Sequence, residues 1–431
     1  MRIGLFTDTY RPSINGIVFV VESLKRELEA LGHEVYVFCP GKNIRPGKAA
    51  ELHEEDDRIV RFPSVKGAFF DDYDTSIFFP PRVIRQIHEL ELDVAHILTP
   101  GQIGLVGIQA AVKGDVPFIM QHSTDVYEFS EDYPAVLPGA LILIGVLLPQ
   151  TVKLGRKDIY EVIKLYRPRT GVTKWNKEII KKAVTILYSK ANAVIALSEK
   201  SAEQLYSWQD DVHYEYDITV MPNGVDALPR PTAAKVKAFC EQYGIAPDDE
   251  VFGFVGRLGK EKNLDMLIPT LEYVAIARPK AKLLFVGDFE YRETLESIAA
   301  ESSVSARIIF TGALPREELG VAYAAMSVFV FPSLKDTQGW VLHEAAHAYL
   351  PIVLIDQKVT QVVRDGENGF FVDNSPEDMS DRIIELLEDE KLRRQMAGRS
   401  QEIAKTLTEK SQVKKLEQLY ESVLVVDDES E

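Results

Sequence analysis

The chain has 431 residues, more than a single hydrophobic core normally organises, so we expect two domains of ordinary size. A hydrophobic fraction of 46% and a charged fraction of 27% are typical of a soluble globular protein, and no apolar run is long enough to cross a membrane. A net charge of −17 argues against a nucleic-acid partner, because contact with phosphate backbones needs a basic surface.

The N-terminus begins with an apolar strand and lacks the basic-then-apolar order of a secretory signal, so we expect the protein to stay in the cytoplasm. Cys39 and Cys240 fit no metal-ligand spacing. We therefore expect neither a disulfide nor a structural zinc ion.

Short apolar runs alternate with helical patterns along the chain, which is typical of βαβ units and parallel sheets. The strands predicted in the first half are Arg2–Thr7, Glu34–Cys39, Ile59–Phe62, Val94–Ile97, Phe118–His122 and Ala193–Leu197. Those predicted in the second half are Ile218–Met221, Val251–Val255, Lys282–Val286, Ile308–Thr311, Val328–Phe331 and Ile352–Ile355. The sequence thus predicts an α/β protein of two doubly wound, Rossmann-like domains that face a cleft.

The domain boundaries follow from composition. We assign residues 1–210 to the first domain, because the polar stretch Ser207–Tyr216 precedes a strand and the turn Pro222-Asn223-Gly224. Residues 211–400 form the second domain. Residues 401–431 form a C-terminal tail with the last amphipathic pattern, Ser400–Val423, and we expect this helical tail to pack back on the first domain.

Residues 135–190 form a segment of unusual composition within the first domain. Ala135–Pro149 is an apolar run of fifteen residues, too short to cross a membrane. Gln150–Lys190 then holds eleven Lys or Arg against three acids, a net charge of +8. Apolar surface beside a basic face is typical of an element that lies on an anionic membrane. The alternative is a buried helix followed by a solvated one.

The stretch Phe252–Asn263 leaves a predicted strand through Gly256 and places Arg257 and Lys262 before a helix begins. Open α/β sheets bind ligands at such strand ends. A departing nucleotide diphosphate needs stabilisation of its developing negative charge more than it needs a strong acid. Arg257 and Lys262 fit that need, and the alternative is that they are merely solvated.

The stretch Phe331–Asn374 predicts a strand, a loop carrying Asp336-Thr337-Gln338-Gly339, and a helix that begins near Trp340. Backbone amides at such a helix start bind diphosphate well. Asp336 and Glu344 are spaced to place one carboxylate in the loop and the other in the helix, where each can accept hydrogen bonds from a sugar or ribose diol. The alternative is a pair of acids that interact with the helix dipole.

One glycine and four histidines lie at other positions that could be functional. Gly16 lies in the loop after the first strand and allows a phosphate or an acceptor to approach the backbone closely. His96 and His122 both end predicted strands, which is the usual place of a structural histidine. His343 and His347 share a helix face, but this spacing without further ligands is a weak zinc signal.

These motifs, in this order, resemble the retaining glycosyltransferases of family 4, whose two Rossmann-like domains form the GT-B fold. The residues that carry the resemblance are Pro222-Asn223-Gly224-Val225-Asp226, Gly256-Arg257 with Lys262-Asn263, Val286-Gly287-Asp288, Phe310-Thr311-Gly312, Phe331-Pro332-Ser333, the Asp336 and Glu344 pair, and Asp365-Gly366-x-x-Gly369.

The resemblance implies roles for individual residues. Arg257 and Lys262, after Gly256, would hold the diphosphate, and Glu344 would bind the ribose. Asp336 and the loop Thr337-Gln338-Gly339 would contact the sugar, which His122 would also reach. The Gly16 loop would border the donor phosphate and the acceptor. This chain departs from the commonest pattern with Asp336 in place of Glu and Gln338 in place of Phe.

The acceptor is inferred from a narrower resemblance. Asp336-Thr337-Gln338-Gly339 and Gly101–Gly104 are most similar to diacylglycerol glucosyltransferases and lipid-linked mannosyltransferases. This implies a metal-independent hexosyltransferase with no bound cofactor. Its donor substrate would be a nucleotide diphosphate sugar such as UDP-glucose and its acceptor a lipid such as diacylglycerol. We expect it at the inner face of the cell membrane, as a peripheral protein in contact with anionic lipid.

Three alternatives remain open from the sequence. The same chemistry could serve a soluble or polysaccharide acceptor. The GT-B scaffold could instead carry a sugar-nucleotide isomerase, which binds the donor but needs no acceptor. A non-catalytic nucleotide-binding module is the third alternative.

Overall fold

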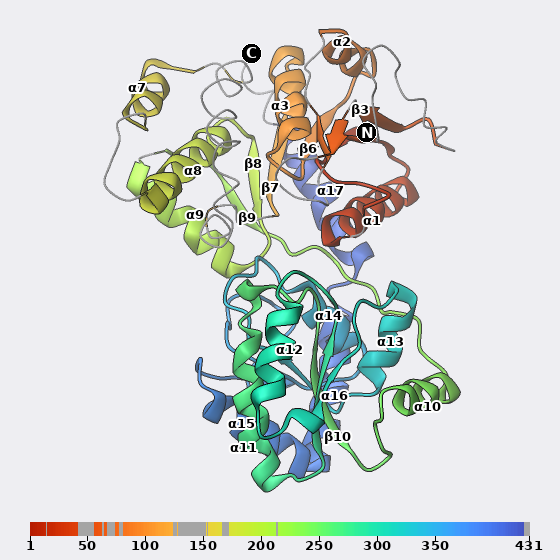
Figure 1. Ribbon diagram of the computed structural model, residues 1–431. Helices are drawn as coiled ribbons and strands as arrows, with labels where there is room; N and C mark the ends of the chain where they lie inside the picture. Colours follow the sequence, from red (N-terminus) through yellow and green to blue (C-terminus); the bar gives the residue numbers. More distant parts are fainter. Residues whose placement is uncertain are drawn as a thin grey trace. The chain divides into compact units, whose positions relative to one another are not determined.

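The computed structural model describes residues 1–13, 15–41, 56–62, 64–66, 74–76, 81–123, 127, 152, 154–165, 172–212 and 214–425. The chain divides into two compact α/β units (Figure 1). Unit 1 comprises Met1–Asn223 together with Glu409–Glu431, and unit 2 comprises Gly224–Thr408.

The sheet of unit 1 has seven parallel strands in the order β3-β2-β1-β6-β7-β8-β9. Their bounds are β1 (Arg2–Phe6), β2 (Glu34–Pro40), β3 (Ile59–Phe62), β6 (Val94–Ile97), β7 (Phe118–His122), β8 (Ala193–Ala196) and β9 (Ile218–Val220). Strands β6, β7 and β8 are buried along their whole length, as strands of a parallel sheet covered on both faces are.

The other described elements of unit 1 are helices and one short hairpin. They are α1 (Gly16–Ala30), the antiparallel pair β4 (Ser64–Lys66) and β5 (Asp74–Ser76), α2 (Pro81–Glu89), α3 (Gln102–Gly114), α7 (Arg156–Leu165), α8 (Val172–Tyr188), α9 (Glu199–Val212) and α17 (Glu409–Val425). Helix α1 begins where the Asn15 side chain accepts a hydrogen bond from the Val18 backbone amide at 3.1 Å, which satisfies one amide of its first turn.

The C-terminal helix α17 belongs to unit 1 although it follows unit 2 in the chain. Its Tyr420 is fully buried and its hydroxyl lies 2.7 Å from His96 Nδ1 on β6. Glu409 pairs with Arg26 of α1, and Glu417 lies 2.7 Å from His33 Nε2. The helix is therefore part of the packing of unit 1, and the chain passes between the two units twice.

The sheet of unit 2 has six parallel strands in the order β12-β11-β10-β13-β14-β15. Their bounds are β10 (Glu250–Val255), β11 (Ala281–Val286), β12 (Ile308–Phe310), β13 (Val328–Phe331), β14 (Ile352–Leu354) and β15 (Gly369–Phe371). The helices are α10 (Ala233–Gln242), η3 (Lys260–Lys262), η4 (Leu264–Met266), α11 (Leu267–Ala277), α12 (Arg292–Glu301), η5 (Ser305–Arg307), α13 (Arg316–Ala324), α14 (Trp340–His347), α15 (Pro376–Glu388) and α16 (Glu390–Ala404).

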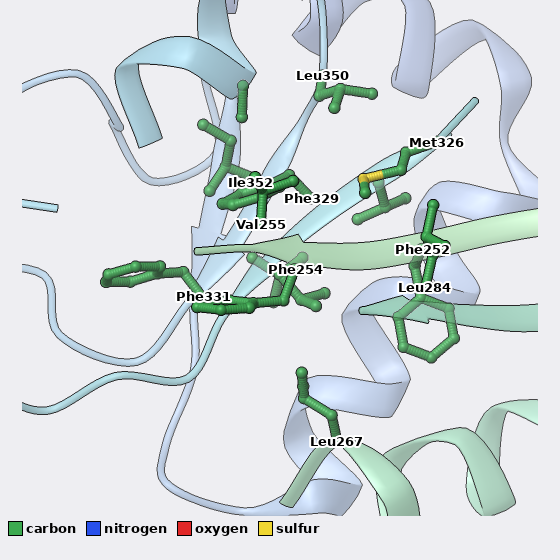
Figure 2. Close-up of a cluster of buried hydrophobic side chains, with 14 of the residues drawn as sticks. Phe252, Phe254, Val255, Leu267, Leu284, Met326, Phe329, Phe331, Leu350 and Ile352 are labelled. Carbon is green, nitrogen blue, oxygen red and sulfur yellow. The ribbon is translucent and has the colours of Figure 1, made fainter. Parts of the chain in front are cut away.

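The core of unit 2 fixes the ends of its two central strands. Phe254 on β10 and Phe331 on β13 stack with their ring centroids 6.2 Å apart, and both side chains are almost wholly buried (Figure 2). Since β13 ends at Phe331 and β10 ends one residue after Phe254, this packing holds the two points from which the next loops leave the sheet.

The boundary between the units differs from the one expected. The structure changes unit between Asn223 and Gly224, not near residue 210. Helix α9 continues to Val212, through most of the polar stretch where we placed the boundary. Its buried face is only a narrow stripe that includes Leu205 and Trp208, so the rest of the helix is polar. The strand predicted at Ile218–Met221 was assigned to the second half, which is wrong, because β9 pairs with β8 in unit 1.

Candidate functional site

The strand order of unit 2 reverses between β10 and β13, which lie side by side but connect to strands on opposite sides. Open α/β sheets bind ligands beyond the carboxyl ends of the strands at such a reversal. The loop after β10 is residues 256–263, and the loop after β13 is residues 332–339. These are the two loops in which the sequence placed Arg257, Lys262 and Asp336.

Two glycines bring the loops after β10 and β11 together. Gly256 and Gly287 have φ angles of +147° and +137°, a region that other residues rarely adopt. A Cβ atom on Gly287 would overlap the carbonyl oxygen of Gly256. The two backbones can therefore approach this closely only because Gly287 lacks a side chain.

Arg257 follows Gly256 and is held loosely. Its guanidinium carbon lies 4.9 Å from the centre of the Phe289 ring, and its Nη2 lies 3.6 Å from Glu261 Oε1. The side chain is 53% exposed. A guanidinium that is presented to solvent at the end of a central strand can pair with an incoming anion.

Lys262 and Asp336 are brought into direct contact from the two loops. The Lys262 Nζ lies 2.7 Å from Asp336 Oδ1, and both side chains are largely buried. Next to Lys262, Asn263 donates from Nδ2 to the Pro332 carbonyl oxygen at 3.3 Å and to Asn374 Oδ1 at 3.0 Å. The loop after β10 is thus tied to the loop after β13, which places a cation beside a carboxylate.

Helix α14 begins directly after the second loop. Gly339 takes a left-handed conformation with φ of +66°, and a Cβ atom there would lie 2.6 Å from Leu342 Cδ1. Gln338 is buried, whereas Thr337 is half-buried. The predicted helix start near Trp340 is confirmed by the bounds of α14.

Glu344 lies in α14 and is almost wholly buried. Its Oε1 accepts hydrogen bonds from Arg316 Nη1 at 2.7 Å and from Trp340 Nε1 at 3.2 Å. Its Oε2 accepts one from the Tyr323 hydroxyl at 2.9 Å. The sequence singled out Glu344 but not Arg316 or Tyr323, because neither belongs to a recognisable motif.

Unit 1 has a comparable reversal between β1 and β6. Asp8, just after β1, accepts hydrogen bonds from Thr99 Oγ1 at 2.5 Å and from the Ile103 amide of α3 at 2.7 Å. Burial raises the pKa of this carboxyl group, although these hydrogen bonds oppose the rise. A Cβ atom on Gly101 would lie 2.5 Å from the Asp8 carboxylate, so this glycine makes room for it.

Gly16 begins α1 and is exposed. A Cβ atom built there meets no other atom within 4 Å, so the space beside this backbone is open. The loop before it is fixed by Asn15, which donates from Nδ2 to Thr9 Oγ1 at 2.9 Å. An exposed helix start after a fixed loop is compatible with the close approach of a ligand that the sequence predicts for Gly16.

His122 ends β7 and is buried. Its Nδ1 lies 2.9 Å from the Tyr188 hydroxyl, and its ring packs edge-on against Tyr188 and Trp208. His96 is fully buried, and burial lowers its pKa to about 4, so its imidazole is neutral at physiological pH. The environment of His96 agrees with the structural role that the sequence gave it.

His343 and His347 lie on one face of α14. Burial lowers the pKa of His343 to about 3, and His347 Nε2 lies 2.8 Å from the Val225 carbonyl oxygen. Within the described residues, no group of three or more His, Cys, Asp or Glu side chains is arranged to hold a metal ion.

Part of the apolar and basic segment can be placed. Ala135–Pro149 lies outside the described residues, as do Lys153, Arg167 and Arg169. Helix α7 is held by Asp158, which accepts a hydrogen bond from the Tyr214 hydroxyl at 2.5 Å and pairs with Lys190 at 3.1 Å. No helix in the described part of the chain is both long and apolar enough to cross a membrane.

Two family descriptions match the chain. Residues 14–227 match Glycosyltransferase Family 4, and residues 236–403 match Glycosyl transferases group 1. The alpha-monoglucosyldiacylglycerol synthase of Acholeplasma laidlawii is 25% identical over 97% of this chain and 96% of its own length. A GDP-mannose-dependent alpha-mannosyltransferase of Mycobacterium tuberculosis is 25% identical over 83% of this chain and 79% of its own length.

Solved structures show the same fold. Sucrose-phosphate synthase from Thermosynechococcus elongatus has a TM-score of 0.68 at 17% identity and covers 99% of both chains. Anabaena HepE in complex with UDP-glucose has a TM-score of 0.64 at 18% identity and covers 99% of this chain and 100% of its own. The predicted pair of Rossmann-like domains is confirmed.

Proposed function

The chain belongs to the glycosyltransferases of the GT-B fold, with a family 4 N-terminal half and a group 1 C-terminal half, and on that premise we propose that it transfers a hexose from a nucleotide diphosphate sugar to a membrane lipid with retention of anomeric configuration. One observation carries the proposal. At the strand reversal of unit 2, the Lys262 ammonium and the Asp336 carboxylate lie 2.7 Å apart, which pairs a group suited to phosphate with one suited to sugar hydroxyls.

The proposed chemistry is electrostatic. As the bond from the sugar to the diphosphate breaks, negative charge develops on the leaving phosphate. Arg257 and Lys262 are assigned to that charge, together with the backbone amides where α14 begins after Gly339. Because these groups neutralise the leaving group, we propose that the reaction needs no metal ion.

The carboxylates are assigned to the rest of the donor. Asp336 accepts hydrogen bonds from sugar hydroxyls, with Thr337, Gln338 and Gly339 beside it, and Glu344 accepts one from the ribose. Gly16 and His122 belong to unit 1 and are assigned to the donor phosphate and the sugar. His122 is buried, with its Nδ1 held 2.9 Å from the Tyr188 hydroxyl.

UDP-glucose is the proposed donor. The name of the Acholeplasma relative refers to a glucosyl product, and the Anabaena structure holds UDP-glucose. The name of the Mycobacterium relative refers to GDP-mannose instead. A donor panel must therefore include both nucleotides.

A lipid acceptor is supported by the relative's name and by the surface of α7. The exposed fractions of Ile159 and Tyr160 are 47% and 60%, and Arg156 and Lys157 beside them are exposed too. Apolar and basic side chains on one exposed helix favour the interface of an anionic membrane. The proposal is thus a peripheral protein on the inner face of the cell membrane, facing the cytoplasm.

The test is a transfer assay with UDP-glucose, UDP-galactose and GDP-mannose, run with diacylglycerol and phosphatidylglycerol vesicles, with soluble sugars in place of vesicles, and without any acceptor, and analysed by mass spectrometry and proton NMR. The expected product is a monohexosyl diacylglycerol with an α-linkage, formed from UDP-glucose only when vesicles are present and at the same rate with EDTA. Transfer to a soluble sugar in the absence of vesicles would contradict the lipid acceptor and support a soluble one. Interconversion of donors without any acceptor would identify an isomerase.

A further inference from the structure

The carboxylate of Glu344 is held by side chains from two helices. Arg316 and Tyr323 lie seven residues apart on α13, which places them on the same helix face, and each donates to a different oxygen of Glu344. Trp340 donates from α14 itself. Three donors around a carboxylate whose side chain is only 2% exposed leave it little freedom to rotate.

A carboxylate has about four acceptor positions. The described residues occupy two on Oε1 and one on Oε2. The position that no described residue fills therefore belongs to Oε2, the oxygen that Tyr323 fixes.

We propose that Arg316 and Tyr323 are positioning residues that aim this remaining acceptor position of Glu344 at a ribose hydroxyl of the nucleotide. The inference rests on the ribose role assigned to Glu344 in the proposed function. It adds the reason why the carboxylate can discriminate between nucleotides with and without a ribose hydroxyl: an oxygen held in one position accepts a hydrogen bond only from a hydroxyl at one place. The site then prefers ribonucleotides to deoxyribonucleotides.

Tyr323 is suited to this task because it remains a hydrogen-bond donor. Its side chain is fully buried, and burial, together with the neighbouring Glu344 charge, raises its pKa well above the usual value. The hydroxyl therefore stays protonated across the physiological pH range. Arg316 adds a permanent charge from a side chain that is 30% exposed.

The experiment measures binding by isothermal titration calorimetry with UDP, 2′-deoxy-UDP and 3′-deoxy-UDP, or with the GDP series if wild type binds GDP more tightly. Wild type should bind the ribonucleotide about tenfold or more tightly than one of the deoxy forms, as a hydrogen bond to a charged group implies. Tyr323→Phe should weaken binding of the ribonucleotide roughly three- to tenfold and leave that deoxy form nearly unchanged. The preference for ribose then shrinks, which a merely structural defect would not produce.

Two failures can be told apart. If wild type shows no preference for ribose, or if Glu344→Gln keeps the preference, the ribose role of Glu344 is wrong and the inference falls with it. If Glu344→Gln abolishes the preference but Tyr323→Phe and Arg316→Gln keep it in full, the ribose role stands and the positioning role is overturned.

Two further variants guard the measurement. Tyr291→Phe also removes a hydroxyl bonded to a carboxylate in unit 2, that of Asp265 at 2.8 Å, and should change no affinity. Because Tyr323 is in the core, Tyr323→Phe could fail to fold, which thermal melting detects. Arg316→Gln then carries the test, since Arg316 is partly exposed, and it should reduce the preference for ribose in the same way.

Discussion

Asn263 is a residue whose side chain and backbone both matter at the candidate site. Its φ of +56° lies in the left-handed region, which Asn and Gly tolerate best, and its amide ties the loop after β10 to Pro332 and Asn374. Asn263→Gly keeps the backbone conformation and removes the amide.

We predict that Asn263→Gly lowers kcat/KM roughly three- to tenfold, because one or two hydrogen bonds that fix Lys262 against Asp336 are lost. The melting temperature should change little. Steady-state kinetics beside thermal melting provide the measurement, and Gly398→Ala in α16, where a Cβ atom meets no neighbour within 4 Å, is the control. Unchanged kinetics in Asn263→Gly would show that the loops do not need this tie.

His96 links acidity to the stability of unit 1. Burial lowers its pKa from 6.5 to about 4, so between these values the unfolded chain binds a proton that the folded chain does not. Stability from this residue is complete above pH 6.5 and is lost as the pH falls towards 4.

We predict that the titration of His96 makes the free energy of unfolding about 2 kcal/mol lower at pH 5 than at pH 7. Guanidinium denaturation of wild type and His96→Gln at both pH values isolates the effect, because Gln cannot titrate. The variant should be less stable than wild type at pH 7 but lose less on acidification. An equal loss in both proteins would contradict the neutral, buried histidine.

At the scale of elements, α17 supplies a face of the unit 1 core. Its Val413, Leu416, Tyr420 and Val423 are all buried. Each large apolar side chain contributes about 1.5–3 kcal/mol when fully buried, so together they are comparable with the whole stability of a typical domain.

We predict that truncation after Thr408 destabilises unit 1 severely, whereas truncation after Val425 has no effect. Limited proteolysis at rising temperature measures this, with cleavage expected within residues 1–223 of the shorter protein and not of the longer one. If both truncated proteins resist proteolysis as wild type does, α17 is dispensable for the fold.

The elements also show how far the sequence reaches. Strands buried on both faces, such as β10 and β13, are apparent as apolar runs that end at glycine or proline. Strand β15, which begins at Gly369, was not singled out from the sequence, and α9 hides a narrow apolar stripe among polar residues. Strand β9 was assigned to the wrong half for another reason. The sheet to which it belongs is determined by its pairing with β8, which the sequence does not show.

The candidate site, like the elements, could be predicted only in part from the sequence. Arg257, Lys262, Asp336 and Glu344 could be singled out because they lie in motifs at strand ends. The contact of Lys262 with Asp336 could not, since it depends on β10 and β13 being neighbours. Arg316 and Tyr323 carry no sequence signal, because their partner is 28 and 21 residues away on another helix.

For the whole molecule, charge distribution decides the proposed membrane contact. A chain of net charge −17 is repelled by an anionic surface unless a local basic region faces it, and residues 150–190 carry +8. Exposed charges act over a Debye length of about 8 Å at physiological ionic strength, so binding should fall steeply with added salt.

We predict that replacing Lys153, Arg156, Lys157 and Lys164 with Gln releases the protein from phosphatidylglycerol vesicles and leaves nucleotide binding intact. Co-sedimentation at low and high salt is the measurement. The matched control replaces four exposed lysines of unit 2 with Gln: Lys235, Lys237, Lys280 and Lys391. This control changes the net charge by the same amount as the test variant and should not release the protein. Release by both variants, or by neither, would remove the support for a lipid acceptor.

The central claim is that the diphosphate of the donor lies where the strand order of unit 2 reverses. It is tested most directly by the turnover of Arg257→Ala, Lys262→Ala and Lys260→Ala in the transfer assay. Lys260 is an exposed lysine between the two and serves as the matched control. The account predicts that the first two variants lose roughly a hundredfold or more in kcat, as removal of one anion-stabilising group typically does, while Lys260→Ala stays near wild type. Near-wild-type turnover in Arg257→Ala and Lys262→Ala would contradict it.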